Sequence, residues 1–109
     1  MRRYERGIDW RRKKSIMPGA PTMLKLAIVP KGFQLTWQLS PQDPGIVTGY
    51  EIVRSDVASG PFTRVATVDK GTSRYIDTMA SPETIYYYKV RTVAGDIYSP
   101  YSNTVTGER

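Results

Sequence analysis

Short runs of alternating apolar and polar residues, separated by turns rich in glycine and proline, constrain this chain more than any other feature of its sequence. The strongest run covers residues 33–39, where apolar side chains hold every odd position: Phe33, Leu35, Trp37 and Leu39. Successive side chains of a β-strand point to opposite faces, so a period of two predicts a strand with one buried face. We therefore expect Trp37 and its odd-numbered neighbours to point into a core.

The rest of the chain repeats this pattern of short runs and turns. Turn residues occur at 30–32 and 58–61, and no helix of useful length is expected. The β-rich runs lie near residues 24–29, 33–39, 49–55, 62–68, 75, 85–94 and 101–106. Seven short strands with regular turn signals predict an all-β fold, a seven-stranded antiparallel immunoglobulin-like β-sandwich.

Tyrosines occupy expected inward positions in two of the expected strands. Alternation directs a second set of side chains inward: Tyr50, Tyr86, Tyr88 and Val90. The consecutive tyrosines at 86–88 could instead suggest an aromatic platform for sugars or bases. Because alternation leaves only Tyr87 outside, we interpret this run as part of the core.

Residues 1–17 form a separate, strongly basic segment, here called the arm. It holds seven basic and two acidic residues, a charge of +5, whereas residues 18–109 hold nine and eight, a charge of +1. Residues 18–21 read Pro-Gly-Ala-Pro, which resists both helix and strand ladder. The sequence thus predicts a basic N-terminal arm at 1–17 and one domain at 18–109.

The arm also carries candidate partner-binding side chains. A tryptophan precedes a run of four basic residues: Trp10, Arg11, Arg12, Lys13 and Lys14. Such a segment can be a solvated tail, a docking arm that becomes ordered on a protein partner, or a contact for nucleic acid or an anionic surface. Among the functional alternatives, we favour docking on a protein partner or assembly.

Enzyme chemistry finds little support in the sequence. The chain has no cysteine and no histidine, which removes the usual metal ligands and nucleophile–base pairs. Its aspartates are dispersed over turns and strand ends, where they have backbone roles. We expect no catalytic residue, no metal, no cofactor and no small-molecule substrate.

No membrane span is expected either. The longest clearly apolar stretch, residues 26–29, falls far short of the roughly 20 residues that a spanning helix needs. No apolar segment of a signal peptide follows the basic N-terminus. If Met1 is the natural start, ordinary secretion is unsupported, and a virion or an extracellular or cell-surface setting is expected over that of a cytoplasmic enzyme.

Several segments, taken in order and spacing, resemble one known family. They lie at residues 21–24, 35–37, 49–54, 86–93 and 99–105. Together they are similar to strands of the fibronectin type III family, and the similarity covers residues 18–107. The resemblance implies that Trp37 is the core tryptophan of the second strand. It also implies that Tyr86 is a tyrosine-corner residue whose hydroxyl bonds to upstream backbone.

The sequence departs from the family before this corner. Where the family often reads Leu-x-Pro-Gly-Thr-x-Tyr, Ala80 replaces the leucine and Glu83 replaces the glycine. We expect Met79 to turn inward and fill the volume, since methionine adapts to irregular gaps. The Arg-Gly-Asp tripeptide of some members is absent, because residues 94–96 read Ala-Gly-Asp, so integrin binding is not carried over.

The loops at 40–48, 69–72 and 94–99 are expected at one end of the sandwich, with Ile46, Tyr98 and Tyr101 as candidate contacts. The expected function is a non-enzymatic protein–protein interaction or structural module. We expect a small stand-alone component of a larger assembly, such as a virion or surface structure, docked through its arm. The alternative is an adhesion, spacer or carbohydrate-associated module of an extracellular bacterial protein. Nucleic-acid binding through the arm is a third possibility.

Overall fold

The computed structural model describes residues 17–109, which form eight β-strands. The predicted arm residues Trp10, Arg11, Arg12, Lys13 and Lys14 lie outside the described residues. The strands are β1 (Thr22–Val29), β2 (Gly32–Gln38), β3 (Gly49–Ser55), β4 (Thr63–Asp69), β5 (Arg74–Asp77), β6 (Ile85–Ala94), β7 (Ile97–Tyr101) and β8 (Val105–Glu108).

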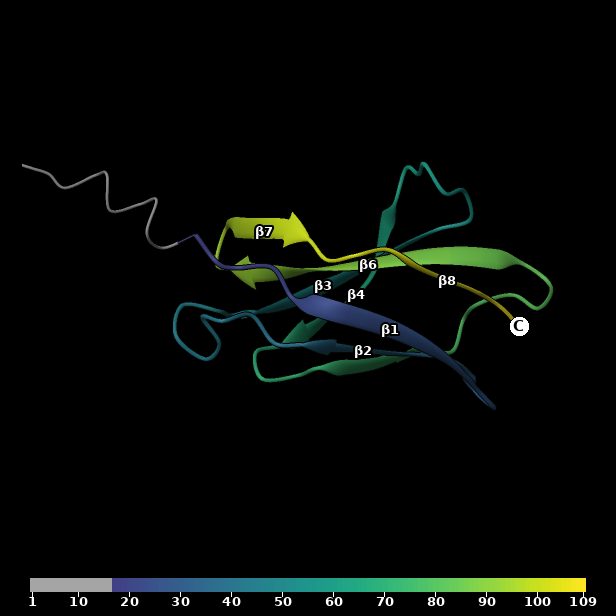
Figure 1. Ribbon diagram of the computed structural model, residues 1–109, viewed down its shortest axis with the longest axis horizontal. Helices are drawn as coiled ribbons and strands as arrows, with labels where there is room; N and C mark the ends of the chain where they lie inside the picture. The colour runs from purple at the N-terminus through teal and green to yellow at the C-terminus, as the bar shows by residue number, and fades with distance from the viewer. Residues whose placement is uncertain (1–16) are drawn as a thin grey trace, which may run out of the picture.

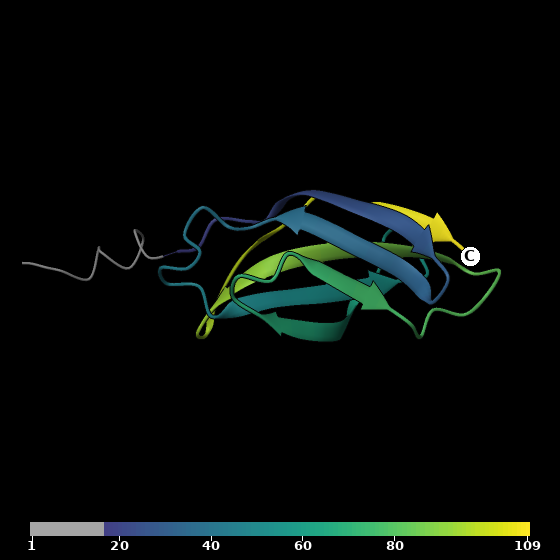
Figure 2. The same ribbon diagram turned by 90° about the horizontal axis from the view of Figure 1, so that it is seen from below.

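The strands form two antiparallel sheets that pack face to face (Figures 1 and 2). The three-stranded sheet has the order β1-β2-β5. The five-stranded sheet has the order β4-β3-β6-β7, and β8 also pairs with β6. The all-β sandwich predicted from the alternation is confirmed, with eight strands in place of seven.

The extra strand is β7, which begins at Ile97, inside the segment 94–99 that was predicted as a loop. That prediction is wrong for residues 97–99, and the last predicted strand, 101–106, is interrupted between Tyr101 and Val105. Between β7 and β8, the side-chain amide of Asn103 makes two hydrogen bonds to the backbone of Leu24 in the edge strand β1. The Leu24 N–H donates to Asn103 Oδ1 at 2.9 Å, and Asn103 Nδ2 donates to the Leu24 carbonyl at 3.0 Å. These two hydrogen bonds tie the segment between β7 and β8 to β1, the edge strand of the other sheet.

The core lies between the sheets, where large side chains from both interdigitate. Trp37, Tyr50, Tyr88 and Val90 are buried, together with Leu24, Phe33, Leu35, Val47, Ile52 and Ala80. The ring of Phe33 meets Tyr88 edge-on at a centroid distance of 5.9 Å. Leu39, expected to point inward, is exposed because β2 ends at Gln38 and the alternation stops there.

A buried ionic cluster joins the two sheets beneath this core. Asp77 of β5 is 1% exposed, and its Oδ2 accepts hydrogen bonds from Arg54 of β3 at 2.7 Å and from the Tyr88 hydroxyl of β6 at 2.6 Å. Burial alone raises the pKa of Asp77, but the hydrogen bonds from Tyr88, the Met79 N–H and Arg54 outweigh it. The pKa of the carboxyl is therefore lowered. The same burial raises the pKa of Tyr88, with the Asp77 carboxylate adding to it.

The corner before β6 departs from the expected packing. Tyr86 is half-buried, and its hydroxyl accepts a hydrogen bond from the Ser81 N–H at 3.2 Å. The partner is upstream backbone, as the resemblance implies. Met79 does not turn inward: it is 78% exposed, while Ala80 occupies the core position itself. The expectation for Met79 is therefore wrong, because Asp77 Oδ1 holds the Met79 N–H in a tight turn.

Candidate functional site

Three loops gather at one end of the sandwich, here called the arm-side end because residue 17 enters there (Figure 1). They are the β2–β3 loop (residues 39–48), the β4–β5 loop (70–73) and the β6–β7 turn (95–96). The Lys70 N–H donates to the Thr48 carbonyl at 3.2 Å, and the Gly95 N–H donates to Thr48 Oγ1 at 3.1 Å. The predicted clustering of these loops is confirmed, although the third is a turn at 95–96 and not the predicted loop at 94–99, because β7 begins at Ile97.

The β2–β3 loop is held by hydrogen bonds to a buried tyrosine, Tyr50. The Tyr50 hydroxyl donates to Asp43 Oδ2 at 2.8 Å and accepts from the Ser40 N–H at 2.9 Å. Asp43 Oδ2 also accepts from the Gly71 N–H at 2.8 Å, which ties in the β4–β5 loop. Burial raises the pKa of Tyr50, and the Asp43 carboxylate adds to the effect. Ile46 lies in this loop and is exposed.

The segment that enters the domain is packed against the same end. Pro18 and Pro21 are fully buried. The Gly19 N–H donates to Gln42 Oε1 at 2.6 Å, and Thr92 Oγ1 donates to the Gly19 carbonyl at 2.8 Å. Residues 18–21 are thus anchored to both the β2–β3 loop and β6.

Tyr98 and Tyr101 belong to a different surface, the outward face of the five-stranded sheet. Both tyrosines lie on β7, and both contact Arg91 of β6, whose guanidinium carbon is 3.8 Å from the Tyr98 ring centroid and 4.8 Å from that of Tyr101. The sequence-based grouping placed them with Ile46. The structure instead joins them to charged residues of the neighbouring strand.

A continuous row of alternating rings and cations results, here called the stripe. The Lys89 ammonium lies 4.7 Å from the Tyr101 ring centroid and 4.1 Å from that of Phe62. The order along the row is Tyr98, Arg91, Tyr101, Lys89 and Phe62. Each cation lies within the roughly 6 Å range over which an aromatic ring attracts it.

Glu51 of β3 fixes the stripe from one side. Its Oε1 accepts from Arg91 Nε at 2.6 Å, and its Oε2 lies 3.6 Å from Arg64 Nε. The Glu51 side chain is 7% exposed, whereas that of Arg64 is 61% exposed. Sequence reasoning missed Phe62, Lys89 and Arg91 as stripe members. The available signal was the outward alternation of Lys89 and Arg91 on the strand beside the tyrosines.

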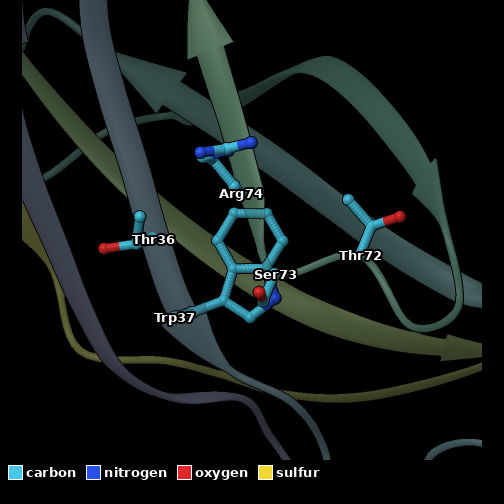
Figure 3. A pocket seen from close by; sticks show the side chains of 5 residues that line it. All are labelled: Thr36, Trp37, Thr72, Ser73 and Arg74. Carbon is cyan, nitrogen blue, oxygen red and sulfur yellow. The ribbon is translucent and has the colours of Figure 1, made fainter.

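An open cleft of about 470 Å³ lies at the other sheet, between β2 and the start of β5. Three hydroxyl side chains, an indole and a guanidinium line it: Thr36, Trp37, Thr72, Ser73 and Arg74 (Figure 3). The Trp37 Nε1–H is buried and has no hydrogen-bond partner among residues 17–109. Trp37 therefore acts mainly through apolar packing, including its tilted contact with Tyr50 at 5.9 Å between centroids.

Three carboxylates of the domain have structural roles in this arrangement. Asp43, Glu51 and Asp77 each hold neighbouring backbone or side-chain donors. Within residues 17–109, no group of three or more His, Cys, Asp or Glu side chains is placed to hold a metal ion. The same residues contain no helix with the length and apolarity of a membrane span.

Most of the domain matches known sequences. The family model described as "Fibronectin type III domain" matches residues 19–108. An amylopullulanase of Thermoanaerobacter thermohydrosulfuricus is 38% identical over 88 residues, which cover 81% of this chain and 6% of that protein. An amylopullulanase of Thermoanaerobacterium saccharolyticum is 36% identical over 91 residues, or 84% of this chain and 7% of that protein. The chain thus spans less than a tenth of the length of these relatives.

Solved structures show the same architecture. An Fn3-like protein from Clostridium thermocellum has a TM-score of 0.70 and 30% identity, covering 82% of this chain and 90% of that one. A β-1,2-glucanase from Parabacteroides distasonis has a TM-score of 0.72 over 85% of this chain and 13% of that one. Its identity of 22% shows a shared fold alone.

Proposed function

Because this chain belongs to the fibronectin type III family, we propose that it is a non-catalytic module that spaces and docks its neighbours within a larger carbohydrate-active protein. The observation that carries the proposal is the path of the chain. The described residues enter at the arm-side end and leave at the opposite end (Figure 1). Sequences attached to the two ends are held apart by the length of the sandwich.

Both ends of the described residues are held against the body of the domain, which keeps these ends at a fixed separation. At the arm-side end, Pro18 and Pro21 are buried and Gly19 is hydrogen-bonded on both its amide and its carbonyl. At the opposite end, the Arg109 guanidinium donates to the Ala80 carbonyl at 2.9 Å.

The similarity to amylopullulanases supports a place beside carbohydrate-degrading domains. The matched segment is only 5–7% of each amylopullulanase, as expected of an accessory module. An extracellular or cell-surface setting is part of the proposal and agrees with the carbohydrate-active names of these relatives. The alternative of a virion component docked through the arm remains a prediction, which the relatives do not favour.

The test is a distance measurement in the full chain. Since the sequence has no cysteine, spin labels can be attached at Met17→Cys and Glu108→Cys, both exposed positions. Strand β6 has ten residues, and at a rise of about 3.3 Å each it spans roughly 33 Å. Pulsed electron resonance should give one narrow distribution of at least that length.

A broad distribution, like that of a glycine–serine linker of equal length, would contradict a rigid spacer. The non-catalytic part is checked separately by incubating the chain with pullulan and soluble starch. We expect no release of reducing ends. Hydrolysis that persists after rigorous purification would overturn that part of the proposal.

A further inference from the structure

The stripe on the five-stranded sheet has no assigned role, and its construction goes beyond what a spacer needs. We propose that it is a docking surface for an acidic protein segment. This inference concerns a different surface from the two chain ends, so it stands or falls independently of the spacer function.

The stripe is held in place before any partner arrives. Arg91 is fixed by its 2.6 Å hydrogen bond to Glu51 and by the rings of Tyr98 and Tyr101. Lys89 lies between two rings, those of Tyr101 and Phe62. Side chains that are already ordered lose little conformational entropy on binding, which favours affinity. Arginine and tyrosine are also the residue types that most often dominate binding energy at interfaces.

The net positive charge of this face favours an acidic partner. Arg64, Lys89 and Arg91 carry +3, and Glu51 carries −1, which leaves a net +2. The negative charge is buried against Arg91, while Arg64 is largely exposed. An approaching molecule therefore meets positive charge, and a segment rich in Asp and Glu is its electrostatic complement.

The arrangement disfavours a sugar as the occupant. Sugar rings stack on free aromatic faces, but Lys89 or Arg91 already lies over a face of each ring in the stripe. Carboxylates instead can bond the outward N–H groups of these cations without disturbing the stack. A protein segment with carboxylates is thus favoured over a glycan.

The test uses the full chain and a 12-residue peptide that alternates Glu and Ser, with a Gln–Ser peptide as the neutral control. Backbone amide signals are followed by ¹⁵N–¹H correlation spectroscopy at about 150 mM salt, where the Debye length is about 8 Å. We expect the acidic peptide to shift the amides of Lys89, Arg91, Tyr98 and Tyr101. Shifts confined to residues 1–17, or none at millimolar peptide, would overturn the proposal.

A matched pair of double variants separates the stripe from net charge. Arg64→Gln with Lys89→Gln removes one stripe cation, Lys89, and the neighbouring cation Arg64. It keeps the Glu51–Arg91 pair, so we expect the fold to be retained. Lys31→Gln with Lys70→Gln removes the same charge from turns of the domain. We expect the first pair to weaken binding at least tenfold and the second less than twofold. An equal loss of peptide affinity in both double variants would show that binding depends on the net charge of the domain, and it would overturn the proposal.

Two further outcomes would replace the proposed occupant. Stripe shifts with maltohexaose but not with the acidic peptide would identify a glycan. Stripe shifts that depend on protein concentration alone would identify a second copy of this chain.

Discussion

Glu83 occupies a backbone conformation that suits glycine. Its φ angle is +61°, in the left-handed region that costs a residue with a Cβ about 1–2 kcal/mol. The resemblance places a glycine at this position, and the structure shows why: the turn before β6 demands a positive φ. The side chain at 83 is exposed, so no packing depends on it.

We therefore expect Glu83→Gly to stabilise the domain by about 0.5–1 kcal/mol, because relief of strain exceeds the greater chain entropy of glycine. Denaturant unfolding at neutral pH measures this. Glu83→Ala is the control, since it removes the charge but keeps the Cβ, and it should bring no gain. Equal stabilisation by both variants would show that the charge, rather than the φ angle, is responsible.

At the scale of elements, β5 depends on Asp77 to connect it to the opposite sheet. The folded state lowers the pKa of Asp77 below its ordinary value of 3.8, because the bonds from Tyr88, Met79 and Arg54 outweigh its burial. The unfolded chain then binds the proton more readily. The stabilisation is fully present above the unfolded pKa, near pH 4, and is lost as the pH falls through the lower folded pKa.

Asp77→Asn should remove this stabilisation at neutral pH. Breaking a buried ion pair costs about 3–5 kcal/mol, and we expect the lower end because the Arg54 side chain is 23% exposed. Urea midpoints between pH 2 and 7 are the measurement, and the variant should show a flatter curve below pH 4. Asp56→Asn, in an exposed turn, should behave as the unaltered chain. An unchanged acid limb in Asp77→Asn would refute the assignment.

Alternation predicted the strands well because it reports one local property, which face of a strand is buried. It could not predict the break between β7 and β8, where Asn103 bonds to Leu24, 79 residues away in the sequence. The stripe was missed for a similar reason. Tyr101 lies opposite Arg91 only in the final strand register, which no local pattern contains.

For the whole molecule, the point where the arm meets the domain can be tested by truncation. Deleting residues 1–17 should change the free energy of unfolding by less than about 0.5 kcal/mol, since Met17 is exposed. Deleting residues 1–21 should destabilise the domain clearly, because Pro18 and Pro21 are buried and the Gly19 bonds are lost. Thermal unfolding of the two truncated chains separates these cases. Unfolding caused by the shorter deletion would show that the arm packs on the sandwich.

The shorter truncation also tests the predicted partners of the arm. Loss of a co-purifying protein on deletion would support docking on a protein. Duplex DNA binding that falls steeply with salt and disappears on deletion would instead support nucleic acid, because neutralised phosphates release counterions.

The entry and exit of the chain at opposite ends determine how the domain bears mechanical load. Strand β1 leads away from the arm-side end, and β8 ends at the opposite end (Figure 1). Tension between the ends pulls along β1, while the hydrogen bonds that hold β1 to β2 run across it. Such tension loads all of these hydrogen bonds in shear at the same time. Strand β1 can therefore separate from β2 only when many of the hydrogen bonds break together. In a protein that is stretched between two anchors, such a domain would act as a stiff link. Its lifetime under force would be set by its unfolding rate.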